Sequence, residues 1–307
     1  MRRAVAPCLR PFGIILPGAA ILLTVSVTFA QPPNRLEAVF PTDSKDPRQA
    51  GGAELLQAVC PGAVETGKHI GSDTPCPDYT DFGRFGDRLP WSLEAVTLGH
   101  FLSPTSEDAV LWMSGCESHA SNLGGTILLT RKSRKWTTLW YRSAVQTAQC
   151  HKVLRSDRRE ILVCIAEDGA QGNNMIELYV EDLLNPKPTL RAGGGNDGTF
   201  FVAFDDTATC GWQQGADAPD TSPVIRTSID MVRFSTRIEP NASAPSMSVG
   251  AGFGKKQMTP EDVKACRDGR EAVLPSVKSY RMDFFYDGHG YEPATSSADT
   301  VQIFMSR

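Results

Sequence analysis

Three residues with chemically reactive side chains stand close together in the stretch GCESH, at residues 115–119. Cys116, Glu117 and His119 have side chains of the types that bind zinc, and a cysteine beside a histidine can also act as a nucleophile. Zinc needs a further ligand, and His100 in the neighbouring turn LGHF is the candidate that the sequence offers. In an extended strand Glu117 and His119 would share one face and Cys116 the other, so only a loop gathers all three. The alternative, which we favour, is a plain turn between two strands.

No other stretch matches a familiar catalytic motif. The sequence contains no Gly-x-Ser-x-Gly, no His-Glu-x-x-His, no phosphate-binding loop and no Cys-x-x-Cys. We therefore expect no cofactor and a non-enzymatic protein, a ligand- or protein-binding module of the cell envelope. The alternative is an exported hydrolase or metal-dependent enzyme, with its site around the four candidate metal ligands named above.

The first 30 residues have the three parts of a secretory signal peptide. A basic start is followed by an apolar run from Phe12 to Ala30, which ends in the small-residue sequence TFA. We predict cleavage after residue 30 and a secreted or periplasmic protein; an uncleaved membrane anchor is the alternative. Cleavage removes three arginines and no acidic residue, so the formal net charge of −4 becomes more negative. That balance argues against nucleic acid or an anionic membrane as a partner.

Cysteines that remain after cleavage should mostly pair in an oxidising compartment. Their number is odd, so at least one cysteine is expected to remain without a disulfide partner in the chain. Cys60 and Cys76 bracket a loop rich in glycine and proline, and a disulfide would close it. Cys210 with Cys266 is a second expected pair, which leaves Cys116 as the spare thiol.

A third pair follows from strand register. A hairpin centred on Asp157, with Leu154 facing Glu160, puts Cys150 directly opposite Cys164. Directly opposed cysteines in an antiparallel pair have Cβ atoms close enough to form a disulfide.

Short β-type runs separated by turn residues occupy most of the chain after residue 94 and predict an all-β fold. They form consecutive four-stranded antiparallel units, either propeller-like or stacked as sheets, with two short helices near residues 53–59 and after Thr259. The expected strands are 94–101, 108–113, 125–131 and 135–142 in one unit, 150–154, 160–166, 175–183 and 188–192 in the next, and 199–206, 228–234, 245–250 and 280–288 in a looser third, with a last strand at 300–305.

The predicted organisation has three parts. A signal peptide at 1–30 is followed by an N-terminal segment at 31–93, with a short helix and a disulfide loop. A β-rich domain of two to three repeat units then covers 94–307.

The stretches LGHFLSPTSEDAVLWMSG (98–115) and GGTILLTRK (124–132) resemble the FG-GAP or VCBS repeat of secreted β-propeller proteins. The resemblance covers residues 95–185 and implies a propeller-like arrangement with a binding role. Calcium-binding members of that family carry an Asp-x-Asp-x-Asp-Gly loop, whereas here Glu107 and Asp108 are the only carboxylates of the corresponding loop. Two or three units are also fewer than a closed ring needs.

Trp136 and Trp140 have the same parity in one predicted strand, so both should face one side of the sheet. If that side is exposed, the two indoles form a platform for a protein or carbohydrate ligand. The alternative is that both belong to the core between two sheets.

Overall fold

The computed structural model describes residues 39–60, 64–66, 69–72, 91–115, 125–143, 145–170, 173–181, 183–184, 199–205, 223–267 and 275–305. This part of the chain is mostly β, and its helices are α1 (Gly52–Val59), α4 (Pro260–Arg267) and α5 (Ala298–Met305). None of the described helices combines the length and the apolar character needed to cross a membrane.

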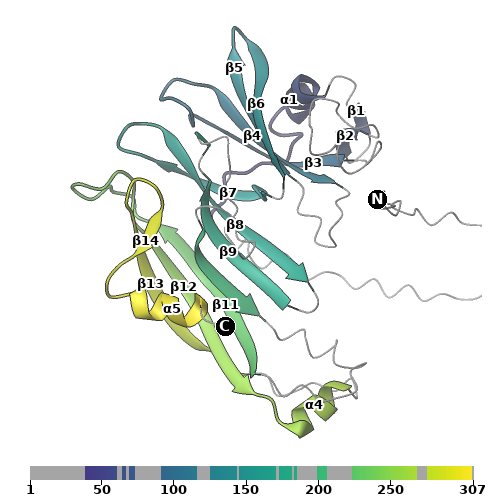
Figure 1. Ribbon diagram of the computed structural model, residues 1–307. Coiled ribbons are helices and arrows are strands. Elements are labelled where there is room, and N and C mark those ends of the chain that lie inside the picture. The colour runs from purple at the N-terminus through teal and green to yellow at the C-terminus, as the bar shows by residue number, and fades with distance from the viewer. Residues whose placement is uncertain are drawn as a thin grey trace, which may run out of the picture.

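The strands form three antiparallel sheets in which strands adjacent in sequence are adjacent in space (Figure 1). The first sheet has six strands, and the second and third have four each. The first holds β1 (Val64–Thr66), β2 (His69–Ser72), β3 (Trp91–Gly99), β4 (Asp108–Gly115), β5 (Gly125–Lys132) and β6 (Lys135–Ser143). The second holds β7 (Gln149–Leu154), β8 (Glu160–Ala170), β9 (Asn173–Glu181) and β10 (Thr199–Asp205). The third holds β11 (Pro223–Phe234), β12 (Met247–Gln257), β13 (Lys278–Tyr286) and β14 (Tyr291–Pro293).

The predicted all-β fold of consecutive antiparallel units is confirmed, and the second and third sheets have the expected four strands. Two assignments need correction. The strand expected at 199–206 is β10, which pairs with β9 and completes the second sheet instead of opening the third. The segment expected as a last strand at 300–305 is helix α5. Its buried residues Val301 and Phe304 are three apart, which places them on one face of a helix and on opposite faces of a strand. The expected strand at 188–192 lies outside the described residues.

Within the N-terminal segment predicted at 31–93, the described elements β1, β2 and α1 pack as part of the first sheet. Strand β2 pairs with β3, and α1 buries Leu55, Leu56 and Val59 against the outer face of that sheet. The sheet is therefore wider than one repeat unit.

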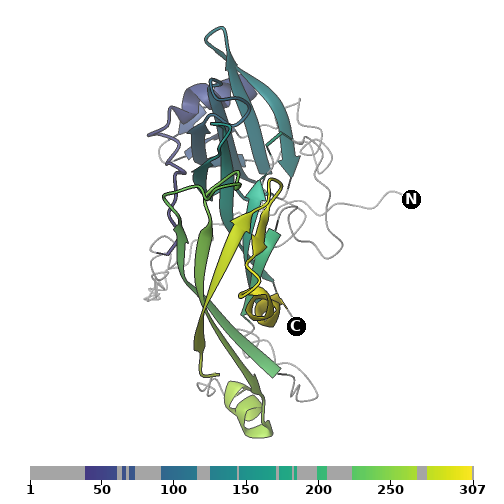
Figure 2. The ribbon, with the colours of Figure 1, turned by 90° about the vertical axis from the view of Figure 1, so that its left-hand side faces the viewer.

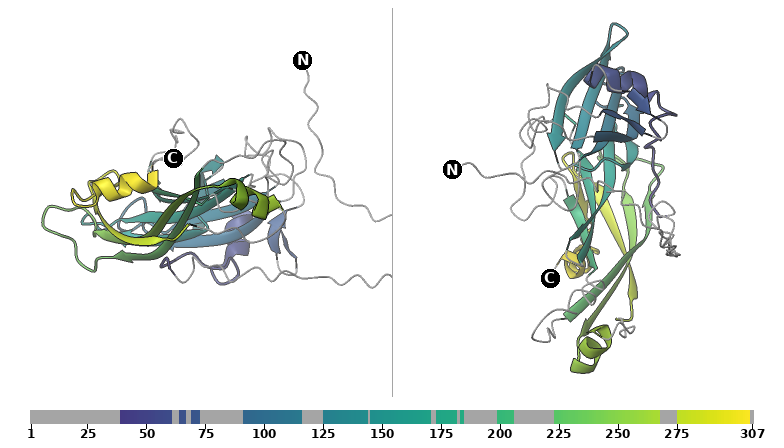
Figure 3. Two further views of the ribbon diagram at one scale, coloured as in Figure 1. Left: turned by 90° about the horizontal axis from the view of Figure 1, so that it is seen from below. Right: turned by 90° about the vertical axis from the view of Figure 1, so that its right-hand side faces the viewer.

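The three sheets are stacked in chain order, because β8 buries both of its faces. Leu162 and Cys164 pack with Val110 of the first sheet, while Val163 and Ile165 on the other face join the core that includes the third sheet. The result is an elongated molecule with α1 near one end and α4 at the other (Figures 2 and 3). Of the two arrangements left open by the sequence, the described residues form a stack and no closed propeller.

Helix α4 begins as the sequence predicts. The Thr259 hydroxyl accepts a hydrogen bond from the Asp262 amide at 3.2 Å, and the Asp262 carboxylate accepts one from the Thr259 amide at 3.0 Å. This is a reciprocal cap of the helix N-terminus. The Lys256 ammonium, 2.8 Å from the same carboxylate, and the bonds from Thr259 lower the pKa of Asp262 to about 2.

An extended segment at residues 39–46, here named the strap, joins the three sheets. The Val39 carbonyl accepts from the Val232 amide of β11 at 3.0 Å. The Asp43 amide donates to the Cys150 carbonyl of β7 at 2.7 Å, and Lys45 exchanges two backbone hydrogen bonds with Val96 of β3. An open strand edge exposes backbone donors and acceptors that require partners. The strap supplies those partners to the edge strands β7 and β11, and to the part of β3 that lies beyond its pairing with β2.

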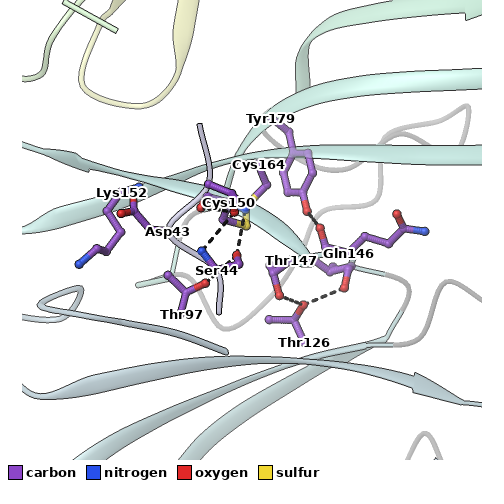
Figure 4. Close-up of a disulfide and its surroundings, with 12 residues drawn as sticks. Asp43, Ser44, Thr97, Thr126, Gln146, Thr147, Cys150, Lys152, Cys164 and Tyr179 are labelled. Atoms are coloured by element: carbon purple, nitrogen blue, oxygen red, sulfur yellow. Dashed lines mark hydrogen bonds between the residues drawn. A yellow bond between two sulfur atoms is a disulfide. The ribbon is translucent and has the colours of Figure 1, made fainter. Parts of the chain in front are cut away.

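The Cys150–Cys164 disulfide lies beside the strap and confirms the predicted hairpin register (Figure 4). Cys150 is opposite Cys164 and Leu154 is opposite Glu160, as expected from the spacing. The two Cα atoms are 4.1 Å apart, and both cysteines are fully buried. The Cys150 amide donates to the Ser44 hydroxyl of the strap at 3.0 Å, so the disulfide and the strap reinforce one another.

Replacing both cysteines in a Cys150→Ala/Cys164→Ala variant should lower the free energy of unfolding by about 3 kcal/mol, because the cross-link no longer restricts the unfolded chain. Urea denaturation of the oxidised protein measures the change. The single variants serve as controls and should lose nearly as much as the double variant. A double variant as stable as the parent protein would show that the cross-link contributes nothing.

Candidate functional site

Turns from all three sheets meet along one side of the stack, where their strands end, and surround a pocket of about 290 Å³. Backbone hydrogen bonds join Glu160 of β8 to His100 of the first sheet at 3.0 Å, and Ser156 to Ser243 of the third sheet at 2.9 Å. The β13–β14 turn, yellow in Figure 1, adds Tyr286 to the wall. We name this cavity the hairpin-end pocket. Pockets between packed units are the usual place for small ligands.

The turn between β3 and β4 is fixed by Asp108, which is 1% exposed. One carboxylate oxygen accepts from the amides of Phe101 and Leu102, both at 2.9 Å, and from the Ser106 hydroxyl at 2.5 Å. A Cβ on Gly99 would lie 2.5 Å from the Phe101 ring and 2.6 Å from the Glu160 carboxylate, so a larger residue at this position would displace these pocket-lining side chains. The Gly-x-Phe and Asp residues of this stretch therefore shape the loop that holds Phe101 in the pocket wall.

Two arginines of the β7–β8 turn dominate the polar side of the pocket. Arg159 donates to Asp157 from Nε and from a terminal nitrogen, at 3.1 and 2.9 Å. Arg155 forms an ion pair with the same carboxylate at 3.3 Å and donates to the Tyr286 hydroxyl at 3.2 Å. Burial alone would raise the pKa of Asp157, but the bonds from Arg159 and the two guanidinium charges outweigh it and lower that pKa. Both arginines are thus held in place by contacts within the protein.

Two carboxylates also line the pocket, and each already has a cation. Glu160 is 3.3 Å from the Lys152 ammonium and accepts from the His100 amide at 2.7 Å. Glu181 pairs with Arg142, and both side chains are almost completely buried, at 3% and 5% exposed. These carboxylates are therefore neutralised by groups behind the pocket wall.

The turn between β13 and β14 contains Asp287, whose carboxylate bonds to backbone amides of the same turn. Its carboxylate accepts from the amides of Gly290 at 2.9 Å and His289 at 2.7 Å, and these bonds lower the pKa of Asp287. Gly288 has a φ of 109°, a left-handed conformation that favours glycine. The stretch DGHGYEP thus contains a turn, and its residues Gly288 and His289 line the pocket.

A second, wider cavity of about 680 Å³ lies beside the strap and is lined by Phe40, His151 and Phe234. The His151 ring stacks near Phe234 with ring centroids 4.5 Å apart and pairs with Asp43 at 2.8 Å. Burial lowers the pKa of His151, although Asp43 acts in the opposite direction. Because the strap itself lines this cavity, its residues already have a structural role, and we favour the hairpin-end pocket as the site.

The predicted metal site is only partly described. The His100 ring bonds to the Ser106 carbonyl of its own loop, which gives that side chain a local structural partner. Cys116, Glu117 and His119 lie outside the described residues. Among the residues that the structure describes, no group of three or more potential ligands is placed to hold a metal ion.

The other predicted disulfides are partly described as well. Cys60 is disulfide-bonded, but its partner lies outside the described side chains. Cys76 and Cys210 also fall outside them, as does the side chain of Cys266. These pairings stay predictions.

The predicted tryptophan platform rests on a parity argument that the structure contradicts. The β5–β6 register shifts by one residue at Leu139, so that Leu128 faces Trp140 while Leu129 faces Thr138. A bulge of this kind reverses the alternation of side chains along the strand. Trp136 packs against the core under α1, whereas Trp140 packs against the core between the first and second sheets.

Sequence reasoning missed the pocket residues Arg155, Arg159 and Tyr286. The only signal was the stretch RSDRRE, which has three arginines in one turn but is equally typical of an exposed hairpin. Nothing in the sequence indicates that this turn meets Tyr286, more than a hundred residues further along the chain.

Comparison of the chain with known protein families, with curated proteins and with solved structures finds no match.

Proposed function

We propose that this protein is an exported, non-enzymatic binding protein that holds a small ligand in the hairpin-end pocket. The observation that carries the proposal is the convergence of turns from three sheets around one cavity of about 290 Å³, whose arginines are positioned by Asp157. A rigid scaffold that presents loop residues around a pocket is the usual arrangement of a ligand site.

Export is supported by two features. The first 30 residues have the pattern of a signal peptide. The buried Cys150–Cys164 disulfide is of the kind that persists in an oxidising compartment such as the periplasm or the outside of the cell. The resemblance to FG-GAP repeats agrees with a binding role by analogy only.

The test is whether small molecules bind in this pocket at all. Leu184 lines the pocket with half of its surface exposed, at 50%, so Leu184→Trp should fill the cavity without disturbing the core. Leu154 is similarly exposed, at 56%, but lies outside the pocket lining, and Leu154→Trp is the matched control.

Ligand-observed NMR on the mature protein, with a mixed set of neutral, cationic and anionic fragments, should reveal binders. We expect the signs of binding in the spectra of these fragments to disappear with the Leu184→Trp variant and to persist with the Leu154→Trp variant. Binding that survives Leu184→Trp would place the site elsewhere, and a fragment set with no binders would contradict the proposed function.

A further inference from the structure

We propose that the hairpin-end pocket binds a small monoanion in which a carboxylate is joined to an apolar group, and that Arg155 and Arg159 hold the carboxylate. The inference rests on the proposed function, because it assigns a ligand class to the same pocket. It follows from the charges, the hydrogen bonds and the wall of the cavity.

The charge balance of the lining favours an anion. Glu160 and Glu181 are neutralised by Lys152 and Arg142, as described above. The two remaining guanidinium groups, Arg155 and Arg159, share the single carboxylate of Asp157. One positive charge of this set is therefore left for a ligand.

Both arginines have donors to spare. A guanidinium carries five N–H groups, and the contacts with Asp157 and Tyr286 described above use two nitrogens of Arg155 and two of Arg159. The planar guanidinium fork matches a carboxylate, and such charge-assisted hydrogen bonds are stronger than neutral ones.

A monoanion fits this pocket better than a phosphate. Only one positive charge of Arg155, Arg159 and Asp157 is uncompensated, so a second negative charge on the ligand would have no cation of this set to pair with. A phosphate group carries between one and a half and two negative charges at neutral pH. The volume of about 290 Å³ equals that of roughly ten water molecules, which limits the ligand to a small organic acid.

The rest of the wall suits an apolar group. Four apolar side chains from the first and second sheets also line the cavity: Phe101, Ile161, Val180 and Leu183. An aliphatic chain or an aromatic ring placed there would lose contact with water, which is favourable in proportion to the apolar area that it buries.

The experiment compares acids with their neutral counterparts by isothermal titration calorimetry on the mature protein at neutral pH and low salt. The probes are benzoate and hexanoate, with benzyl alcohol, hexanol and inorganic phosphate as comparisons. We expect each carboxylate to bind at least about tenfold more tightly than the matching alcohol, and phosphate to bind more weakly than either acid.

Two variants test the role of the arginines. Arg155→Gln should weaken benzoate binding at least about tenfold and leave benzyl alcohol binding unchanged. Arg158→Gln is the matched control, because Arg158 lies in the same turn but is exposed and outside the pocket lining. If Arg155→Gln fails to fold, as judged by circular dichroism, Arg159→Gln supplies the same test.

The outcomes separate the two proposals. Alcohols that bind as tightly as the acids, phosphate that binds more tightly, or an equal loss in Arg158→Gln would overturn the assignment of a carboxylate ligand. Each of these results leaves a pocket that binds small molecules. If no probe binds and the fragment set is also silent, the proposed function itself is wrong.

Discussion

An Arg142→Met variant should lower the free energy of unfolding by about 3 to 5 kcal/mol. Arg142 and Glu181 form an ion pair between the first and second sheets, with side chains 5% and 3% exposed. Methionine fills a similar space but leaves the Glu181 carboxylate buried without this cation. The guanidinium also stacks over the Trp140 ring, 4.1 Å from its centroid, and that contact is lost too.

The chain contains a matched control for this change. Arg131 also pairs with a glutamate, Glu107, at 3.0 Å and lies over a tryptophan ring, but its side chain is 39% exposed. Arg131→Met should therefore cost no more than about 1 kcal/mol. Urea denaturation followed by tryptophan fluorescence and circular dichroism measures both variants.

The double variant Arg142→Met/Glu181→Leu should recover most of the stability, because an apolar pair of similar volume can replace a buried ion pair. Equal losses in Arg142→Met and Arg131→Met would mean that burial of the pair has no energetic consequence. If the double variant were less stable than Arg142→Met, the loss in Arg142→Met could not be explained by burial of the Glu181 carboxylate without its cation.

A Phe40→Ala variant should cost about 3 to 5 kcal/mol, as expected for removing a fully buried aromatic side chain. Phe40 is 2% exposed and belongs to the core that joins the second and third sheets, where its ring meets Phe234 edge to face at 6.5 Å between centroids. It anchors the strap, so its loss should also release the strap from the strand edges that it covers.

Hydrogen exchange distinguishes the loss of core packing from the release of the strap. The Val232 amide, which bonds to Val39, should exchange faster in Phe40→Ala than amides in the middle of the third sheet. Lys45→Ala is the control, because Lys45 holds β3 through its backbone alone and should lose less than about 0.5 kcal/mol. A loss below 1 kcal/mol in Phe40→Ala with unchanged Val232 protection would show that the strap does not depend on this anchor.

Local patterns were sufficient for most of the fold. Alternation of apolar and polar residues between turn signals predicted the strands, and the Cys150–Cys164 register followed from counting residues on either side of one turn. These features depend on neighbours in sequence, whose pairing is set by strand periodicity and turn length. The same reasoning failed at residues 300–305, where a short apolar run fits a helix and a strand equally well.

Other features depend on contacts between residues far apart in the chain. Leu139 has no partner in β5, and the pairing of β5 with β6 differs by one residue on its two sides, so the opposite orientations of Trp136 and Trp140 could not be read from parity. The strap meets β7 through a hydrogen bond between residues separated by 109 positions. No local pattern encodes such a contact.

The sequence by itself determined a disulfide-containing, all-β chain built from successive antiparallel meanders, because periodicity, turns and cysteine spacing act over a few residues. Only the tertiary structure decided that the sheets stack, that the strap bonds to one strand of each sheet, and that Arg155, Arg159 and Tyr286 meet around one pocket. The physical reason is that burial and charge compensation arise when the sheets pack. A guanidinium in a turn has the same appearance in the sequence whether it faces water or completes a binding site.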